Sequence, residues 1–321
     1  MKIMKKLFFF AAVAATLVAC SSSDPAQEAP KNDTIRLTTS VAGQTRSTSQ
    51  TLQGTQIANG SSVWVEMSYD GTATNTTDWG SGPYENKAAY TADGAGVLNG
   101  ATVKWPVTGD EAGKIVTAEA WAPATAKLTA FTVKSDQTAE ADYIASDFLY
   151  GKTRTAGYSY TDVVTNGDPI EIKFAHKLAK VNVTISAATN AAGAAIDPTG
   201  AKIEFGPSVL GASIGANGNV TKDASAAATI VMTSALEAAK TASAIMIPQE
   251  IAAGQLLKIT IGTGTTAAVY VYSLSAAKTF DAGKVYTYTL SLRGDGSIIV
   301  LNEKIDDWEA GTTETITATK Q

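Results

Sequence analysis

The chain contains one histidine, His176, and one cysteine, Cys20, and these are the side chains best suited to metal binding or nucleophilic chemistry. A single imidazole cannot supply a multi-histidine metal site, and no histidine-linked motif supports a serine triad around it. We therefore predict no metal site and no catalytic residue, and we interpret His176 as a structural residue beside an expected strand at 170–174.

Carboxylates and aromatic residues are the remaining candidates for chemistry. Asp306 and Asp307 are adjacent, and because neighbours on a strand point to opposite faces, they do not converge on one substrate. We expect them in a solvated turn before Trp308. A glycosidase that uses only carboxylates stays open as an alternative function, and it would need paired carboxylates on an aromatic face. The aromatic candidates are Trp64, Trp79, Tyr84, Tyr90 and Trp105, of which only Trp79, in a Thr/Asp/Gly-rich loop, is expected to be exposed. No nucleotide-binding motif occurs in usable context, so we predict no cofactor.

The N-terminus predicts export. Three lysines precede an uncharged run from Leu7 to Ala19, which is too short to span a bilayer and is typical of a signal peptide. The sequence Leu17-Val-Ala-Cys20 has the form of a lipobox, which predicts cleavage after residue 19 and a lipid on Cys20. An ordinary signal peptide with a chance cysteine remains the alternative. Since Cys20 is the only thiol, no internal disulfide is possible.

Residues 20–33 are polar and almost free of apolar side chains, which predicts a flexible tether. Signal removal takes three of the 25 basic residues and leaves 22 against 30 acidic ones. This negative balance argues against nucleic acid as a partner.

Alternation of apolar and polar residues dominates the rest of the chain and predicts an all-β fold. The clearest expected strands are 34–41, 63–69, 114–121, 127–133, 170–174, 181–185, 256–261, 268–274, 285–292 and 297–305. Pairs such as Asn217-Gly218 and Asp295-Gly296 separate strands with residues that tolerate positive φ. The small-residue stretches 187–200 and 211–228 are expected to be surface loops. The length suggests two β-sandwich domains, 34–166 and 167–321, divided at Asn166-Gly-Asp-Pro169.

Several segments, taken in order, resemble the fimbrillin family, the lipoprotein-type pilus subunits of Gram-negative gut and oral anaerobes. They are the lipobox, Thr45-Arg46, Asp147-Phe-Leu-Tyr150, Phe174-Ala-His-Lys-Leu-Ala-Lys-Val181, Ile247-Pro-Gln249, Gly283-Lys-Val-Tyr-Thr-Tyr-Thr-Leu290, and Ile305-Asp-Asp-Trp308 followed by Gly311. Together they span nearly the whole chain.

The resemblance implies two transthyretin-like β-sandwich domains and assembly by strand exchange. An arginine-specific protease would cut between Arg46 and Ser47 and release the first strand, 34–43, whose Ile35, Leu37 and Val41 share one face. The vacated groove would then accept a C-terminal donor segment that includes Trp308 and Ile316 from the next subunit.

Two roles follow from this resemblance. The first is a polymerising stalk subunit of a cell-surface fimbria, with other copies of itself or related pilins as partners. The alternative is a non-polymerising surface or tip adhesin that binds a glycan or a host protein. The segment beyond Trp308 favours the stalk subunit, because a tip subunit has no need of a donor tail.

Overall fold

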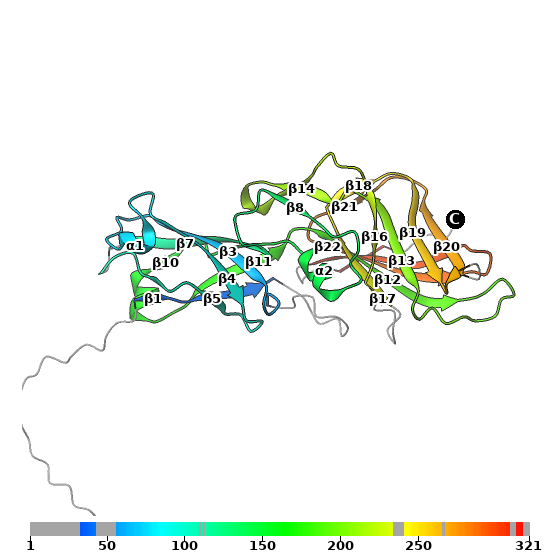
Figure 1. The fold of residues 1–321 in the computed structure, drawn as a ribbon, viewed down its shortest axis with the longest axis horizontal. Helices are drawn as coiled ribbons and strands as arrows, with labels where there is room; N and C mark the ends of the chain where they lie inside the picture. The colour runs from blue at the N-terminus through cyan, green and yellow to red at the C-terminus, as the bar shows by residue number, and fades with distance from the viewer. Residues whose placement is uncertain are drawn as a thin grey trace, which may run out of the picture. The chain divides into compact units, whose positions relative to one another are not determined.

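A computed structural model describes residues 33–42, 56–108, 111, 113–233, 241–264, 267–308 and 313–316, the last range by its backbone only. These residues belong to one compact unit, Asn32–Gln321. The fold is all-β, as predicted (Figure 1). Helical segments in the described ranges are short: α1 (Thr76–Trp79), α2 (Glu140–Ala145), the π-helical η1 (Thr161–Thr165) and the 3-10 turn η2 (Ala216–Gly218). None of them has the length and apolar character needed to cross a bilayer.

An eight-stranded sheet forms the first part of the fold. Its spatial order is β2 (Leu37–Val41), β11 (Ile170–His176), β9 (Leu149–Lys152), β7 (Ile115–Ala122), β3 (Ser62–Tyr69), β4 (Glu85–Ala92) and β5 (Leu98–Gly100), with β10 (Tyr158–Ser159) paired to β7. The strands alternate between buried and exposed positions, as in β3, because one face of the sheet covers a core.

The first core lies between this sheet and a two-stranded sheet made of β1 (Thr34–Ile35) and β6 (Val103–Lys104). Its large members include Val65, Met67, Trp79, Trp105 and Ile172, all buried. β1 and β2 are therefore part of this core, since they supply both a pairing partner and buried side chains.

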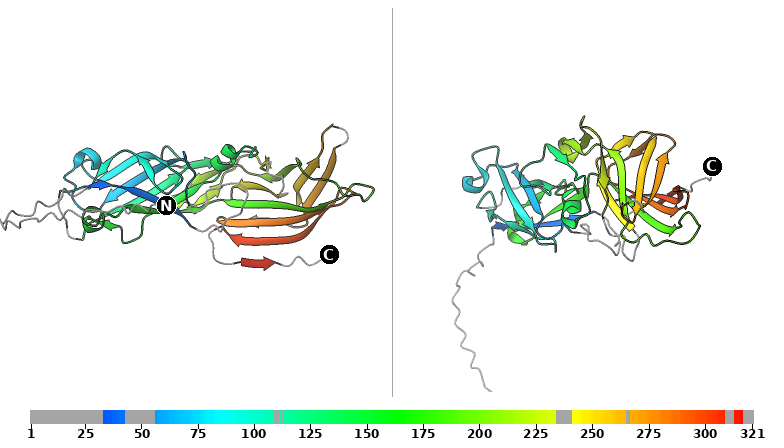
Figure 2. Two further views of the ribbon diagram at one scale, coloured as in Figure 1. Left: turned by 90° about the horizontal axis from the view of Figure 1, so that it is seen from below. Right: turned by 45° about the vertical axis from the view of Figure 1, so that its right-hand side comes forward.

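The second part of the fold contains two larger sheets. One has the order β17 (Thr241–Met246), β12 (Ala179–Ala188), β22 (Lys284–Leu292), β23 (Ile298–Asp307) and β24 (Thr313–Ile316). The other has the order β16 (Ala228–Val231), β13 (Lys202–Ser208), β19 (Gly254–Ile261) and β20 (Ala268–Leu274). β18 (Gln249–Ile251) pairs with β21 (Lys278–Phe280). β24 is the red arrow near the C-terminus in Figure 2.

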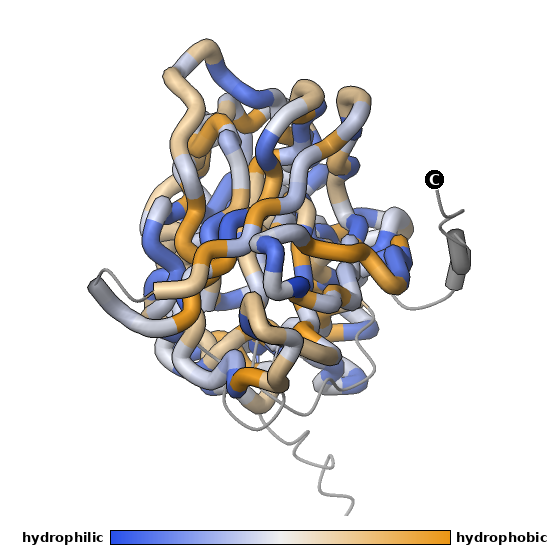
Figure 3. The backbone as a smooth tube through the Cα atoms, turned by 90° about the vertical axis from the view of Figure 1, so that its right-hand side faces the viewer, coloured by the Kyte–Doolittle hydropathy of each residue, from blue (hydrophilic) through white to orange (hydrophobic). Residues whose placement is uncertain are grey.

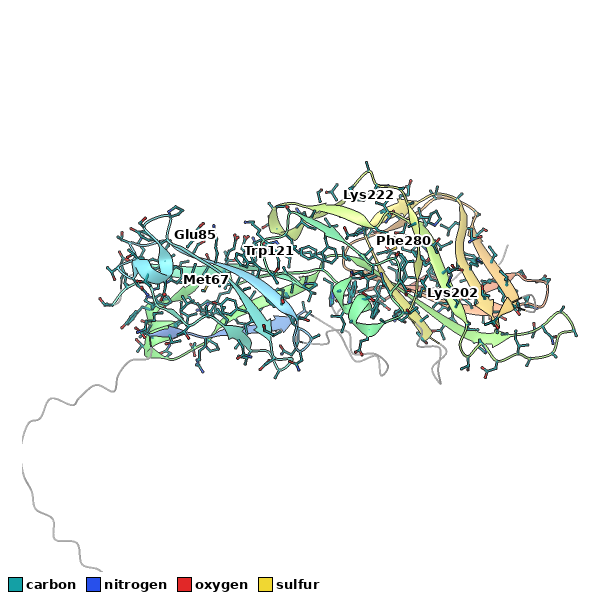
Figure 4. All side chains as sticks on the ribbon, in the orientation of Figure 1. Met67, Glu85, Trp121, Lys202, Lys222 and Phe280 are labelled. Carbon is teal, nitrogen blue, oxygen red and sulfur yellow. The ribbon has the colours of Figure 1, made fainter. Side chains whose placement is uncertain are left out.

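The two larger sheets form a β-sandwich, because both contribute buried side chains to the second core. Val183 and Tyr288 come from one sheet, and Phe205 and Leu257 from the other. Figure 3 shows that apolar (orange) and polar (blue) stretches both occur throughout the folded chain. Figure 4 labels three buried side chains, Met67 from the first core and Trp121 and Phe280 from the second.

The stretch 211–228, expected to be a loop, contains two paired strands, and this prediction was wrong. β14 (Gly211–Ile214) pairs with β15 (Val220–Lys222) on one side and with β8 (Ala130–Thr132) on the other. The turn between β14 and β15 contains Asn217 and Gly218, both at positive φ, which is the conformation that Asn-Gly favours in hairpins.

The predicted division at 166/167 falls inside the first sheet rather than between sheets. β11 lies beyond it in sequence, yet pairs in parallel with β2 and antiparallel with β9. Phe148 and Tyr150, from the first half of the chain, also belong to the second core. A division into two domains stays a prediction, and by its pairing β11 belongs with the first part.

Candidate assembly site

The first strand is buried along one face, as its alternation predicted. Ile35, Leu37 and Val41 are 7%, 3% and 3% exposed and pack in the first core. Burial of an Ile, Leu or Val side chain contributes about 2 kcal/mol, so these three together contribute about 6 kcal/mol. The strand is therefore an integral part of the fold before any cut is made.

Backbone hydrogen bonds hold β2 on both of its edges. On one edge it runs parallel to β11, and the N–H of Ala42 donates to the carbonyl of Phe174 at 2.9 Å. On the other edge the N–H of Thr39 donates to the carbonyl of Gly96 at 2.8 Å, next to an isolated antiparallel bridge between Thr38 and Val97. Removal of β2 would consequently leave unpaired backbone groups on two neighbouring segments.

The structure describes Arg36 but not Arg46. Arg36 connects β1 to β2, its carbonyl accepts from the N–H of Ile170 at 2.8 Å, and its guanidinium donates to the carbonyl of Gly167. Its peptide bond is thus held within paired backbone. Arg46, Ser47 and Cys20 lie outside the described residues, so the cleavage and lipidation sites remain predictions.

The C-terminal end of the chain pairs differently. β24 runs antiparallel to β23, and its register places Ile316 opposite Glu303 and Thr313 opposite Asp306. β24 therefore adds a short strand at the edge of the sheet. Residues 309–312 and 317–321 lie outside the described residues.

Trp308, expected in the donor segment, is 1% exposed and belongs to the second core of its own chain. Its backbone N–H donates to the carbonyl of Gly283 at 2.7 Å. Trp308 is therefore fixed in the core of its own chain by both its ring and its backbone.

A buried polar group that the sequence did not reveal lies beneath Trp308. We call Asp147, His176, Lys180 and Trp308 the His176 cluster. His176 Nδ1 lies 2.9 Å from Asp147 Oδ1, with both side chains fully buried. The imidazole stacks on the Trp308 ring, with ring centroids 4.0 Å apart and an interplanar angle of 5°. His176 is buried, and its partner Asp147 lies 29 residues away in the sequence, where no local motif pointed to it.

Lys180 completes the cluster. Its Nζ lies 5.9 Å from the centre of the Trp308 ring, within cation–π distance. Burial lowers the pKa of Lys180 to about 8, and the nearby charge of Asp147 acts in the opposite direction. Burial of these polar and charged groups therefore costs free energy, which their contacts with one another must offset.

Asp306 and Asp307 lie at the end of β23, so the predicted turn before Trp308 was wrong. Asp306 Oδ2 lies 3.0 Å from Lys304 Nζ, and Asp307 forms an ion pair with Lys284. Separate partners of this kind agree with side chains on opposite faces of a strand. The two carboxylates do not form an acid–base pair.

Trp79 was expected to be exposed, and it is fully buried instead. It ends helix α1, its indole N–H donates to the carbonyl of Lys104 at 2.8 Å, and its ring packs edge-on against Tyr69. Tyr90 and Trp105 are also buried, whereas Trp64 and Tyr84 are half-buried. Among the described residues, no group of three or more His, Cys, Asp and Glu side chains is arranged to hold a metal ion.

The fold and the site define an all-β protein whose specialised features are its two terminal segments. A sequence profile described as fimbrillin-like matches residues 45–308. The chain belongs to this fimbrillin-like family, as the sequence resemblance indicated. It is thus a protein of the fimbrial class, whose members are found at the cell surface.

Two solved structures share the fold. A candidate cell-adhesion protein from Bacteroides ovatus is 18% identical, with a TM-score of 0.60, and the match covers 87% of this chain and 99% of the other. A candidate cell-adhesion protein from Bacteroides uniformis is 20% identical, with a TM-score of 0.56 and coverage of 87% and 100%. No curated protein matches the chain.

Proposed function

We propose that this chain is a stalk subunit of a surface fimbria, and that it polymerises by strand exchange after cleavage following Arg46. The supporting observation is the first strand. β2 is paired on both edges and buries apolar side chains. Its covalent connection to the strands that follow runs only through the segment that contains Arg46. One cut in that segment makes the strand a separate peptide.

The physical basis is β-augmentation. Departure of β1 and β2 exposes the edge of β11, the backbone at Gly96 and the pockets of Ile35, Leu37 and Val41. A strand from another subunit that pairs with these edges and fills these pockets restores both hydrogen bonds and apolar burial. Since the contact is head-to-tail, it does not close on itself and produces a filament.

The remaining steps follow from the ends of the chain. The precursor is held on the outer membrane by a lipid on Cys20, an arginine-specific protease makes the cut, and the subunit then joins the fimbrium. Its partners are other copies of itself or related pilins. The donated segment begins after Trp308, because Trp308 is buried in its own subunit, and it includes Ile316.

The composition of the tail favours a second candidate role. Beyond Trp308 the apolar residues are Ala310, Ile316 and Ala318, whereas the first strand buries an isoleucine, a leucine and a valine. A tail with so few apolar residues would fill the groove only in part. This favours a non-polymerising surface or tip adhesin, which would bind a glycan or a host protein.

The test compares polymer formation in cells that express Arg46→Ala, the matched control Arg293→Ala, or a deletion of 312–321. Arg293 is exposed in the connection between β22 and β23 and has no expected role in cleavage. We expect folded, lipid-anchored monomer from Arg46→Ala, cleaved but poorly polymerised protein from the deletion, and a denaturation-resistant ladder from Arg293→Ala.

Wild-type ladders from both Arg46→Ala and the deletion would contradict strand exchange. A wild-type protein that is cleaved, forms no ladder and binds glycan or host protein would support the adhesin instead.

A further inference from the structure

The His176 cluster joins three parts of the chain that are distant in sequence: Asp147, the neighbouring residues His176 and Lys180, and Trp308 just before the C-terminal tail. Asp147 precedes β9, His176 ends β11, Lys180 lies in β12, and Trp308 follows β23. The cluster therefore contains the residue that directly follows β23.

Efficient packing alone does not explain why Asp147, His176 and Lys180 are buried beside Trp308. Burial of charged groups is expensive, and apolar residues of similar volume often stabilise such sites equally well or better. His176 Nε2 and Trp308 Nε1 are buried and lack a hydrogen-bond partner within the described ranges. Buried polar groups of this kind are best justified when they specify one geometry.

The geometry that the cluster specifies is the position of Trp308. Hydrogen bonding to Asp147 orients the imidazole of His176, and this imidazole offers a flat surface to the indole. Lys180 lies near the same indole, and the carbonyl of Gly283 holds the Trp308 backbone. The indole ring and the backbone are thus both held, and together they set the point at which the chain leaves the core.

We propose that Asp147 and His176 are positioning residues for fimbrial assembly, which hold Trp308 as the anchor from which the donor tail leaves the subunit. Only the residues after Trp308 are then donated, and they leave at one point relative to the core. This inference rests on the proposed strand exchange. It adds that the donor function of a subunit depends on the cluster, whereas its acceptor function does not.

The test uses two full-length chains with separate roles. A donor chain carries Arg46→Ala, so it keeps its first strand and cannot accept. An acceptor chain lacks 312–321, so it is cleaved but cannot donate. Mixed in the presence of the protease, the two chains are expected to form a denaturation-resistant dimer. His176→Ala is then placed in either the donor or the acceptor.

We expect His176→Ala to lower the dimer yield at least ~10-fold when it is in the donor and to leave the yield unchanged in the acceptor. Val183→Ala, which removes a buried side chain from β12, is the control for general destabilisation and should affect both roles alike. The double variant Asp147→Asn with His176→Phe keeps a flat ring beneath Trp308 and should partly restore donation.

A second measurement avoids polymerisation and guards against loss of folding. Chymotrypsin should cleave after Trp308 slowly in uncleaved wild-type monomer and at least ~10-fold faster in the His176→Ala monomer. Normal donation by His176→Ala, equal losses in both roles, or unchanged protection of Trp308 would overturn the inference. Absence of dimer from the unmodified pair would overturn the proposed strand exchange itself.

Discussion

The two ends of the folded chain are attached in different ways. At the N-terminal end, β2 is paired on both edges and buries apolar side chains in the first core. At the C-terminal end, β24 adds to the edge of one sheet, and the buried anchor, Trp308, precedes it. An end that fills a core loses both apolar burial and backbone pairing when it leaves, whereas a short strand at the edge of a sheet detaches at lower cost.

The largest expected effect is at the anchor. Trp308→Ala should lower the free energy of unfolding of the uncleaved monomer by about 4 kcal/mol, since it removes a fully buried tryptophan from the second core. Urea unfolding followed by circular dichroism measures this loss. A loss under ~1 kcal/mol would show that Trp308 belongs to the detachable tail and would remove the contrast between anchor and tail.

The first strand should give the next largest effect. Leu37→Ala is expected to lower the free energy of unfolding of the uncleaved monomer by about 3 kcal/mol, because Leu37 is 3% exposed in the first core. The same urea measurement applies, with Thr38→Ala on the half-buried face of β2 as the matched control. Equal, small losses from both variants would mean that the first strand is only loosely attached.

The pH dependence of stability should report on the His176 cluster. Burial lowers the folded-state pKa of Lys180 to about 8 from 10.5, so between these values the unfolded chain binds a proton that the folded chain has lost. Lys180 by itself should therefore raise the free energy of unfolding by about 2 kcal/mol from pH 8 to pH 10. Above pH 10 the trend should reverse, because burial raises the pKa of Tyr90 to about 12 and keeps it protonated only when folded.

Urea unfolding at pH 8, 9 and 10 measures this rise. Burial also lowers the pKa of Lys278 to about 8, so this lysine adds to the same rise. Lys180→Met should reduce the rise by about 2 kcal/mol and leave the part that comes from Lys278, whereas Leu37→Ala should leave the slope unchanged. A slope in Lys180→Met equal to that of the wild type would contradict the prediction.

The smallest effect should come from the tail. Deletion of 312–321 removes β24 and its edge pairing with β23, and we expect the free energy of unfolding of the uncleaved monomer to change by less than ~1 kcal/mol. A loss comparable to that of Leu37→Ala would show that both ends are integral to the fold and would contradict the contrast between them.

The local sequence pattern was sufficient to predict many of the strands and turns. The strand predicted at 268–274 is β20 with the same bounds, and the alternation of 34–41 correctly placed Ile35 and Leu37 on the buried face. Asn217-Gly218 forms the tight turn that its residue types favour. These features depend on neighbours in sequence, so a period of two and turn chemistry are enough to predict them.

Long-range contacts decided the rest. Trp79 occupies a polar loop in sequence, yet its ring is buried because the chain around Lys104 and Tyr69 surrounds it. β11 pairs with β2, although more than a hundred residues separate them. The local sequence around His176 indicates neither Asp147 nor Trp308 as its partner. The sequence by itself determined the all-β class and the buried face of the first strand. Only the tertiary structure decided which side chains meet at the root of the tail, because burial there depends on segments brought together by the folded sheets.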